Sequence, residues 1–193
     1  MSPQPSAKRV GIFGGSFNPP HVAHVLAVTY VLSTEPVDEV FVVPVFQHPF
    51  SKDLTPFEDR LQMCLRAFGG LSRVTVSAVE RELGGDSLTL RTVEHLAAAH
   101  PTWSFRLIIG SDVLSDLPKW HRFERIAELA PPIVLQRNGH SGESSRVFLP
   151  ELSSTAVRRM LMEDDQAGLY HALPTEVRRY IADHGLYREG RPP

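Results

Sequence analysis

Short runs of β-branched and aromatic residues alternate with helical segments along this chain. The runs read as buried strands at residues 9–13, 39–44, 73–77, 104–109 and 132–136, with a short final strand at 146–149. The helical segments fall at residues 21–32, 57–68, 87–100, 153–162 and 175–184, with shorter pieces between 113 and 129. Strands that alternate with helices form a parallel sheet covered on both faces. We therefore predict an α/β fold class, a Rossmann-like parallel sheet with helices on both faces.

The spacing of apolar residues predicts which faces the first two helices bury. These residues are Val25, Leu26, Val28 and Val31 in the first helix, and Leu61, Cys64, Leu65 and Phe68 in the second. Cys64, on an apolar face, is therefore expected in the core and not as a nucleophile. Ligands of parallel sheets bind beyond the carboxyl ends of the strands. This rule directs the search for a site to residues 14–24, 44–52, 110–120 and 137–155.

Size and composition bound the class of protein. With 193 residues the chain has room for one domain of ordinary size, which we expect at residues 1–187, followed by a disordered tail at 188–193. A formal charge of −2 argues against a general nucleic-acid binder. The apolar stretch at residues 25–32 is too short to span a membrane. A single cysteine excludes an internal disulfide and a thiolate zinc cluster, so we expect a cytoplasmic protein.

The turn after the first strand reads Gly-Gly-Ser-Phe-Asn-Pro-Pro-His-Val-Ala-His, from Gly14 to His24. It is neither a Gly-x-x-x-x-Gly-Lys-Ser/Thr loop nor a Gly-x-Gly-x-x-Gly loop. Glycines let backbone amides approach an anion, and a helix start adds free N–H groups and positive dipole. His21 and His24, three residues apart, project from one face of the first helical turn. Zinc is disfavoured because no His-Glu-x-x-His pattern or third ligand accompanies them.

The string from Gly14 to His24 resembles the nucleotide-binding signature of the nucleotidyltransferase superfamily, and in particular that of the bacterial nicotinate-nucleotide adenylyltransferases. Ala23 departs from the pattern, because it stands where the superfamily usually has glycine. The resemblance extends over residues 10–187 and implies a fold of the nucleotidyltransferase α/β phosphodiesterase type. It also implies transfer of the adenylyl group of ATP to nicotinate mononucleotide, giving nicotinate adenine dinucleotide and pyrophosphate in NAD biosynthesis.

The resemblance assigns ligands to the residues of this first loop. Asn18 is expected to contact the mononucleotide. The residues expected to contact ATP are Gly14, Gly15, Ser16, Phe17, His21 and His24.

A second anion site is predicted at the helix that begins near residue 153. The string Ser153-Ser154-Thr155 followed by Arg158 places hydroxyls and free amides at a helix start, with the arginine one turn later. Alone, this pattern is more often a serine cap with a surface arginine. It resembles the Ser-Ser-Thr-x-x-Arg motif of the family, which implies that these four residues bind ATP.

Two further segments resemble family elements that contact the substrates. Gly110 and Asp112 follow the fourth strand and are similar to a Gly-x-Asp element that binds the nucleotide, although Asp112 is also placed to cap a helix. Trp120 is similar to the tryptophan that stacks on the pyridine ring, with a place in the core as the alternative. The backbone amide of His121 is then placed to meet the substrate carboxylate.

Other expected contacts depart more from the family pattern. Ser87 and Thr89 resemble the segment that receives the nicotinate carboxylate, but Leu88 replaces an aromatic residue. Arg137 is similar to an ATP-binding Arg-Pro-Gly element in which Asn138 replaces the proline. In the loop that follows the second strand, His48 and Lys52 are separated by three residues, where relatives place His and Lys side by side. Both are expected near the mononucleotide, with a solvated loop lysine as the alternative.

The reaction implied by the resemblance is an attack of the mononucleotide 5′-phosphate on the α-phosphorus of ATP. The attacking phosphate is already ionised, so positioning and charge stabilisation can supply catalysis without a strong base. The expected catalytic residues are His21, His24, Lys52 and Arg158. The expected cofactor is Mg²⁺, held mainly by ATP phosphates and water and not by protein ligands.

The expected partners are ATP and nicotinate mononucleotide, with no nucleic acid and no membrane. Two other functions stay open on the sequence. One is the same transfer to nicotinamide mononucleotide, because Leu88 and the loop at residues 45–52 depart from the family. The other is a catalytically silent nucleotide-binding module, which ATP would stabilise without release of pyrophosphate.

Overall fold

A computed structural model of the chain describes residues 7–47, 54–136 and 149–188. Its centre is a five-stranded parallel sheet in the order β3-β2-β1-β4-β5. The strands are β1 (Arg9–Gly15), β2 (Glu39–Pro44), β3 (Val74–Val76), β4 (Ser104–Gly110) and β5 (Pro132–Leu135). The predicted parallel sheet is confirmed, and these strands overlap the first five predicted ones. The last predicted strand lies mostly outside the described residues, although the Leu149 N–H donates to the Gln136 carbonyl at 3.4 Å.

The strand order creates a switch point beside β1. The chain runs outward from β1 to β2 and β3, then returns to pair β4 with the other side of β1, where Ile12 lies opposite Leu107. The connections from β1 and β4 therefore leave in opposite directions and open a crevice at the carboxyl ends of these two strands.

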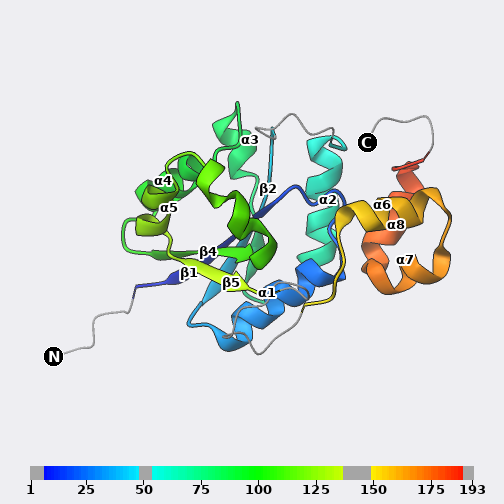
Figure 1. The fold of residues 1–193 in the computed structure, drawn as a ribbon, viewed down its shortest axis with the longest axis horizontal. Coiled ribbons are helices and arrows are strands. Elements are labelled where there is room, and N and C mark those ends of the chain that lie inside the picture. Colours follow the sequence, from blue (N-terminus) through cyan, green and yellow to red (C-terminus); the bar gives the residue numbers. More distant parts are fainter. Residues whose placement is uncertain (1–6, 48–53, 137–148, 189–193) are drawn as a thin grey trace.

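Helices cover both faces of the sheet (Figure 1). They are α1 (Val22–Thr34), α2 (Phe57–Phe68), α3 (Val79–Leu83), α4 (Thr89–Ala99), the 3₁₀ helix η1 (Ser111–Lys119), α5 (Phe123–Leu129), α6 (Ser154–Met162), α7 (Gln166–Ala172) and α8 (Thr175–His184). The sequence does not predict α3 and α7, because five and seven residues span too few turns to show an apolar period.

Two hydrophobic cores lie on opposite faces of the sheet. Phe13 of β1 packs in one of them, with residues of α1, α2 and the C-terminal helices. Ile12, the neighbouring residue of β1, packs in the other with residues of α4 and α5. Because successive strand residues point to opposite faces, β1 contributes to both cores and is buried on both sides.

The predicted buried faces of the first two helices are each wrong at one leucine. Leu26 of α1 is 42% exposed and Leu65 of α2 is 43% exposed. Apolar residues surround much of α1, so their spacing does not select one face, and the observed face includes Ala23 and Ala27. In α2, Leu65 lies off the buried stripe, in which the charged residue Arg60 occupies a position.

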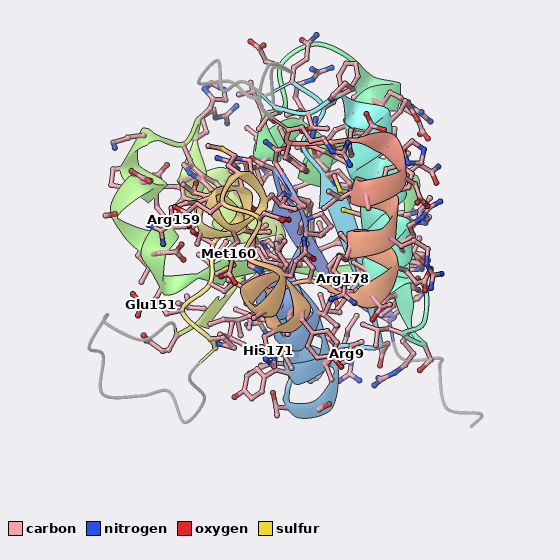
Figure 2. All side chains as sticks on the ribbon, turned by 90° about the vertical axis from the view of Figure 1, so that its right-hand side faces the viewer. Arg9, Glu151, Arg159, Met160, His171 and Arg178 are labelled. Carbon is pink, nitrogen blue, oxygen red and sulfur yellow. The ribbon has the colours of Figure 1, made fainter. Side chains whose placement is uncertain are left out.

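The C-terminal helices pack against the first two helices of the chain: α7 contacts α1, and α8 contacts α2 (Figure 2). The Tyr180 hydroxyl of α8 donates to Asp59 of α2 at 2.8 Å, and the Arg66 guanidinium lies 4.3 Å from the centre of the Tyr180 ring. These contacts hold α8 along α2. Among the described residues, no helix is long and apolar enough to cross a membrane.

Candidate active site

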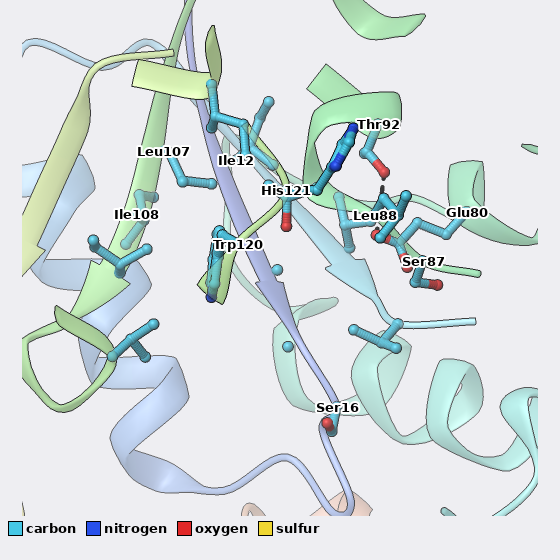
Figure 3. A pocket seen from close by; sticks show the side chains of 18 of the residues that line it. Ile12, Ser16, Glu80, Ser87, Leu88, Thr92, Leu107, Ile108, Trp120 and His121 are labelled. Atoms are coloured by element: carbon cyan, nitrogen blue, oxygen red, sulfur yellow. Dashed lines mark hydrogen bonds between the residues drawn. The ribbon is translucent and has the colours of Figure 1, made fainter. Parts of the chain in front are cut away.

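A cavity of about 390 Å³ opens at the carboxyl ends of β1, β2 and β4, the edge at which the sequence predicts a ligand. Two groups of residues in its lining contain residues predicted for the site, and the polar residues Glu80, Thr92, Asp116 and Lys119 also line it. We call Gly14–Ser16 the glycine turn, and we call Ser87, Leu88, Thr89, Trp120 and His121 the tryptophan wall. In Figure 3, Ser16 lies at one end of the pocket, and His121 and Leu88 lie toward the other.

The glycine turn leaves open space at its first residue and little space at its second. A Cβ atom on Gly14 would meet nothing within 4 Å, whereas one on Gly15 would lie 3.1 Å from the Phe17 ring. Phe17 has a φ of 45°, in the left-handed region, and its side chain is only 1% exposed. The chain therefore turns sharply after β1, which leaves the backbone of Gly14 open to the cavity.

The two histidines of the first loop lie against each other. His21 is the N-cap of α1, and its ring stacks on that of His24 with 3.7 Å between centroids. The His21 backbone N–H donates to Nδ1 of His24 at 3.1 Å. Because Nδ1 accepts this bond, a neutral His24 carries its proton on Nε2. The structure thus brings together the pair that the sequence places on one helical face.

The predicted second anion site packs directly on the first loop. Ser153 caps α6 by accepting the Ala156 N–H at 3.1 Å, as the sequence predicts for a helix start. The Ser154 hydroxyl donates to the Pro19 carbonyl at 2.9 Å. Arg158 donates to the Asn18 carbonyl at 2.8 Å and to the Thr155 hydroxyl at 3.3 Å. Residues separated by about 140 positions in sequence therefore meet at one loop.

Asn18 is a junction between the first loop and the end of the chain. Its Oδ1 accepts the Thr55 N–H at 3.2 Å and the Tyr187 hydroxyl at 2.9 Å. Its Nδ2 is buried and has no hydrogen-bond partner among the described residues, although such groups are rarely left unpaired. Tyr187 is itself buried, and this burial raises the pKa of its hydroxyl. The sequence gives no indication that Tyr187 supports the loop.

The tryptophan wall comes from two segments on the face of the sheet that α4 and α5 cover, opposite α1 and α2. Ser87, Leu88 and Thr89 lie at the start of α4, while Trp120 and His121 follow η1. Trp120 is half-buried, borders the second core and lines the cavity, so the core position given as the alternative to a stacking role describes only part of its environment. The structure thus brings four predicted residues, Ser87, Thr89, Trp120 and His121, to one cavity together with Leu88.

Several predicted site residues lie apart from the cavity lining: Phe17, Asn18, His21, His24, Gly110, Asp112, Ser153, Ser154, Thr155 and Arg158. Gly110 ends β4 and is the N-cap of η1, so the interpretation of Asp112 as a helix cap is wrong. Asp112 is exposed in the first turn of η1. The proposed roles of both residues in nucleotide binding remain predictions. His48, Lys52 and Arg137 lie outside the described residues.

Two buried charged residues support the cavity and are absent from the predicted site. Arg60 of α2 is 1% exposed, and Glu80 of α3 is 8% exposed and lines the cavity. Burial lowers the pKa of the Arg60 guanidinium and raises that of the Glu80 carboxyl. A lone arginine on the apolar stripe of α2 is a signal that could have identified Arg60. Glu80 gives no comparable signal, because α3 has only five residues.

Comparisons with known proteins show which family the chain belongs to. A family model described as cytidylyltransferase-like matches residues 12–160. The chain is 47% identical to a probable nicotinate-nucleotide adenylyltransferase of Anaeromyxobacter dehalogenans (strain 2CP-C), over 94% of this chain and 97% of the relative. A protein of the same name from Myxococcus xanthus (strain DK1622) is 41% identical, over 97% of this chain and 98% of the relative.

A solved structure shows the same fold. The nicotinic acid mononucleotide adenylyltransferase of Plasmodium falciparum, complexed with NaAD, superposes with a TM-score of 0.81 at 23% identity, over 93% of this chain and 97% of that one. The match of the family model over most of the chain and the identity to the curated relatives establish membership. The chain belongs to the cytidylyltransferase-like family and, within it, to the nicotinate-nucleotide adenylyltransferases.

Proposed function

We propose that this chain transfers the adenylyl group of ATP to nicotinate mononucleotide, releasing pyrophosphate and forming nicotinate adenine dinucleotide. The observation that carries the proposal is a single cavity lined by both the glycine turn and the tryptophan wall. Such a cavity can hold a polyphosphate beside a pyridine ring, which the joining of two nucleotides requires. The names of the relatives support the same reaction, and the proposed compartment is the cytoplasm.

The proposed adenylyl transfer requires the site to position the substrates and to stabilise charge. An oxygen of the mononucleotide 5′-phosphate attacks the α-phosphorus of ATP, a new P–O bond forms, and the bond to the pyrophosphate oxygen breaks. Because the attacking oxygen is already anionic, no residue has to remove a proton from it. The site must align the two phosphates and stabilise the charge that moves onto the leaving group.

We assign the donors of the first loop to the phosphates of ATP. Nε2 of His24 carries a proton in the neutral ring, since Nδ1 accepts the His21 N–H, and it can donate to a phosphate oxygen. The open backbone at Gly14 lets a phosphate approach without a side chain in the way. His21 is proposed as the second imidazole donor, with Lys52 and Arg158 completing the catalytic set.

Arg158 has two tasks in this proposal. One of its nitrogens holds the Asn18 carbonyl and another holds the Thr155 hydroxyl. A guanidinium has five N–H donors, so donors remain for the outer phosphates of ATP. Asn18, whose Nδ2 is buried without a partner among the described residues, is proposed to donate to the mononucleotide.

Mg²⁺ enters this proposal with ATP, as part of the substrate complex. Within residues 7–47, 54–136 and 149–188, no group of three or more His, Cys, Asp or Glu side chains could hold a metal ion. These residues do not fit a protein cage for a resident cation. ATP phosphates and water are therefore the proposed ligands of the ion.

The proposed acceptor is nicotinate mononucleotide, because part of the tryptophan wall lies at the N-terminus of helix α4. Free N–H groups at the start of α4, near Thr89, and the backbone N–H of His121 favour a carboxylate over a neutral amide. Trp120 offers a ring face for the pyridine. Nicotinamide mononucleotide is the second candidate acceptor, because Leu88 stands where the family has an aromatic residue.

The test is pyrophosphate release from the purified chain with MgATP and either mononucleotide. We expect faster release with the acid. Faster release with the amide would keep the reaction and overturn the assignment of the wall to a carboxylate. No release with either, in a sample whose melting temperature rises on addition of ATP, would favour a silent nucleotide-binding module.

A further inference from the structure

The segment Val45–Gln47 lies between the two groups of residues that line the cavity. It follows β2, and the Val45 N–H donates to the Gly15 carbonyl of the glycine turn at 2.9 Å. Its other end meets the tryptophan wall, since the Ser87 N–H donates to the Gln47 carbonyl at 2.9 Å. The segment therefore links the glycine turn to Ser87 of the tryptophan wall, and a movement of it would shift one relative to the other.

Arg60 holds one side of the segment. Its guanidinium donates to the carbonyls of Val45 at 2.7 Å and Phe46 at 3.4 Å. The same guanidinium donates to the carbonyls of Ser16 at 3.0 Å and Thr55 at 2.8 Å. A single buried cation thus joins α2, the glycine turn and the segment after β2. The planar guanidinium fixes the directions of all four bonds.

Glu80 holds the opposite side of the segment. Its Oε2 accepts the Phe46 N–H at 3.1 Å, and its Oε1 accepts the Thr92 hydroxyl at 3.1 Å. Ser87 also hydrogen-bonds to this carboxylate, while the Ser87 hydroxyl oxygen accepts the N–H groups of Phe46 at 2.9 Å and Gln47 at 3.1 Å. Figure 3 shows Glu80, Ser87, Leu88 and Thr92 grouped on one side of the pocket.

The two charges meet at one residue. The Phe46 carbonyl accepts a hydrogen bond from Arg60, and the Phe46 N–H donates one to Glu80. A continuous series of hydrogen bonds therefore runs from Ser16 through Arg60, Phe46 and Glu80 to Ser87. We propose that Arg60 and Glu80 are positioning residues that set the distance between the glycine turn and the tryptophan wall. The proposal rests on the function proposed above, because only a reaction between two substrates depends on that distance.

The proposed reaction explains why such positioning residues are needed. Two phosphates must be held in line, and a displacement of about 1 Å can cost about 10²-fold in rate. Buried charges that are fully hydrogen-bonded define one arrangement of their partners, whereas apolar contacts allow sliding. The carbonyls around Arg60 and the donors around Glu80 compensate the burial of each charge.

The first test compares Glu80→Asp and Glu80→Ala with Glu82→Ala, which removes an exposed carboxylate from the same helix. We expect Glu80→Ala to raise the KM for the mononucleotide about tenfold and Glu80→Asp to raise it severalfold, with the KM for ATP changed less than about twofold. Glu80→Gln keeps an acceptor for the Phe46 N–H, so its KM for the mononucleotide should stay close to that of the unchanged chain. Glu82→Ala should match the unchanged chain.

The second readout does not depend on activity. Hydrogen exchange at the Phe46 and Gln47 amides should accelerate about tenfold in Glu80→Asp, while amides within β1 and β4 keep their protection. This result would support a local role. A uniform loss of protection with equal increases in both KM values would overturn the proposal and make Glu80 a residue of general stability.

The matching test on the other charge is Arg60→Lys against Arg66→Lys, an exposed arginine of the same helix. Lysine keeps the charge but cannot form the four bonds, so kcat should fall about tenfold and both substrates should bind more weakly. Unchanged kinetics in Arg60→Lys would overturn the proposal. If the unchanged chain releases no pyrophosphate, the proposed function fails, and the exchange at Phe46 still decides whether Glu80 holds the segment.

Discussion

The glycine turn and the tryptophan wall line the same cavity but are supported in different ways. The loop that continues from the glycine turn is bonded by residues of α2, α6 and the end of the chain, and Phe17, Asn18 and His21 on it are almost fully buried. The tryptophan wall lies on a helix start and on the end of a 3₁₀ helix, and its five residues are half-buried or exposed.

This difference matches what the two groups are proposed to bind. A polyphosphate has the same shape and charge in every reaction of this kind, so a rigid, preorganised set of donors suits it. The two candidate acceptors, nicotinate and nicotinamide mononucleotide, differ by one small group. A site on short surface elements can change to distinguish them with little effect on the hydrophobic cores. We therefore expect substitutions near the first loop to affect the chemical step, and substitutions in the wall to affect binding of one substrate.

The largest effect is expected from His24→Ala. The change removes a proposed phosphate donor and the acceptor of the His21 N–H, so kcat should fall about 10²- to 10³-fold. Steady-state pyrophosphate release measures it. His171→Ala, which removes an exposed histidine of α7, is the control and should leave kcat unchanged. A loss confined to the KM for the mononucleotide would contradict the assignment to ATP.

The next effect is expected from Gly14→Ala. The added methyl enters open space beside the cavity, so the melting temperature should stay the same while kcat/KM falls by about 10-fold or more. Gly70→Ala, with equally open surroundings outside the cavity lining, should change neither quantity.

Gly11→Ala completes this set of glycine variants. A Cβ at Gly11 would lie 2.8 Å from the Ile108 side chain, so this variant should lose about 1–3 kcal/mol of stability through overpacking. Calorimetry on the three variants separates the two causes. A marked fall in the melting temperature of Gly14→Ala would show that this glycine serves the fold and not the ligand.

The same contrast explains how far the sequence could lead. The first loop and the start of α6 are local patterns, in which glycines, prolines and hydroxyl residues each fix the backbone near themselves. Both could therefore be located from the order of residues alone. The faces buried by α1 could not, because its apolar residues surround the helix and only the neighbouring elements select Ala23 and Ala27 over Leu26.

Two of the supporting residues, Tyr187 and Glu80, were beyond prediction for a different reason. Tyr187 meets Asn18 across 169 positions, and Glu80 meets Phe46 across 34. Such contacts depend on the whole topology, and neither a tyrosine near the end of a chain nor a glutamate in a five-residue helix is unusual. Sequence patterns therefore identified residues proposed to touch the substrates more readily than residues that hold them in place.

A smaller effect, on the other side of the cavity, is expected from Trp120→Ala. Loss of a stacking surface should raise the KM for the mononucleotide about tenfold and leave the KM for ATP nearly unchanged. Trp120→Phe should lie between this variant and the unchanged chain. Trp103→Phe, at a tryptophan that stacks on His100, is the control. Equal changes in both KM values would mean that the wall shapes the whole cavity and does not select one substrate.

The smallest effect is expected from Tyr187→Phe, which tests whether support from the end of the chain matters to the first loop. The change removes the hydroxyl that donates to Asn18, leaving the ring in place, so about 1 kcal/mol of stability should be lost. Because Asn18 also accepts the Thr55 N–H, its side chain stays partly held, and kcat should fall only about two- to fivefold. Tyr170→Phe, at an exposed tyrosine of α7, is the matched control for denaturant unfolding and kinetics. If stability falls while kcat stays the same, the bond to Tyr187 serves the fold alone, and Thr55, Ser154 and Arg158 suffice to hold the loop in its working arrangement.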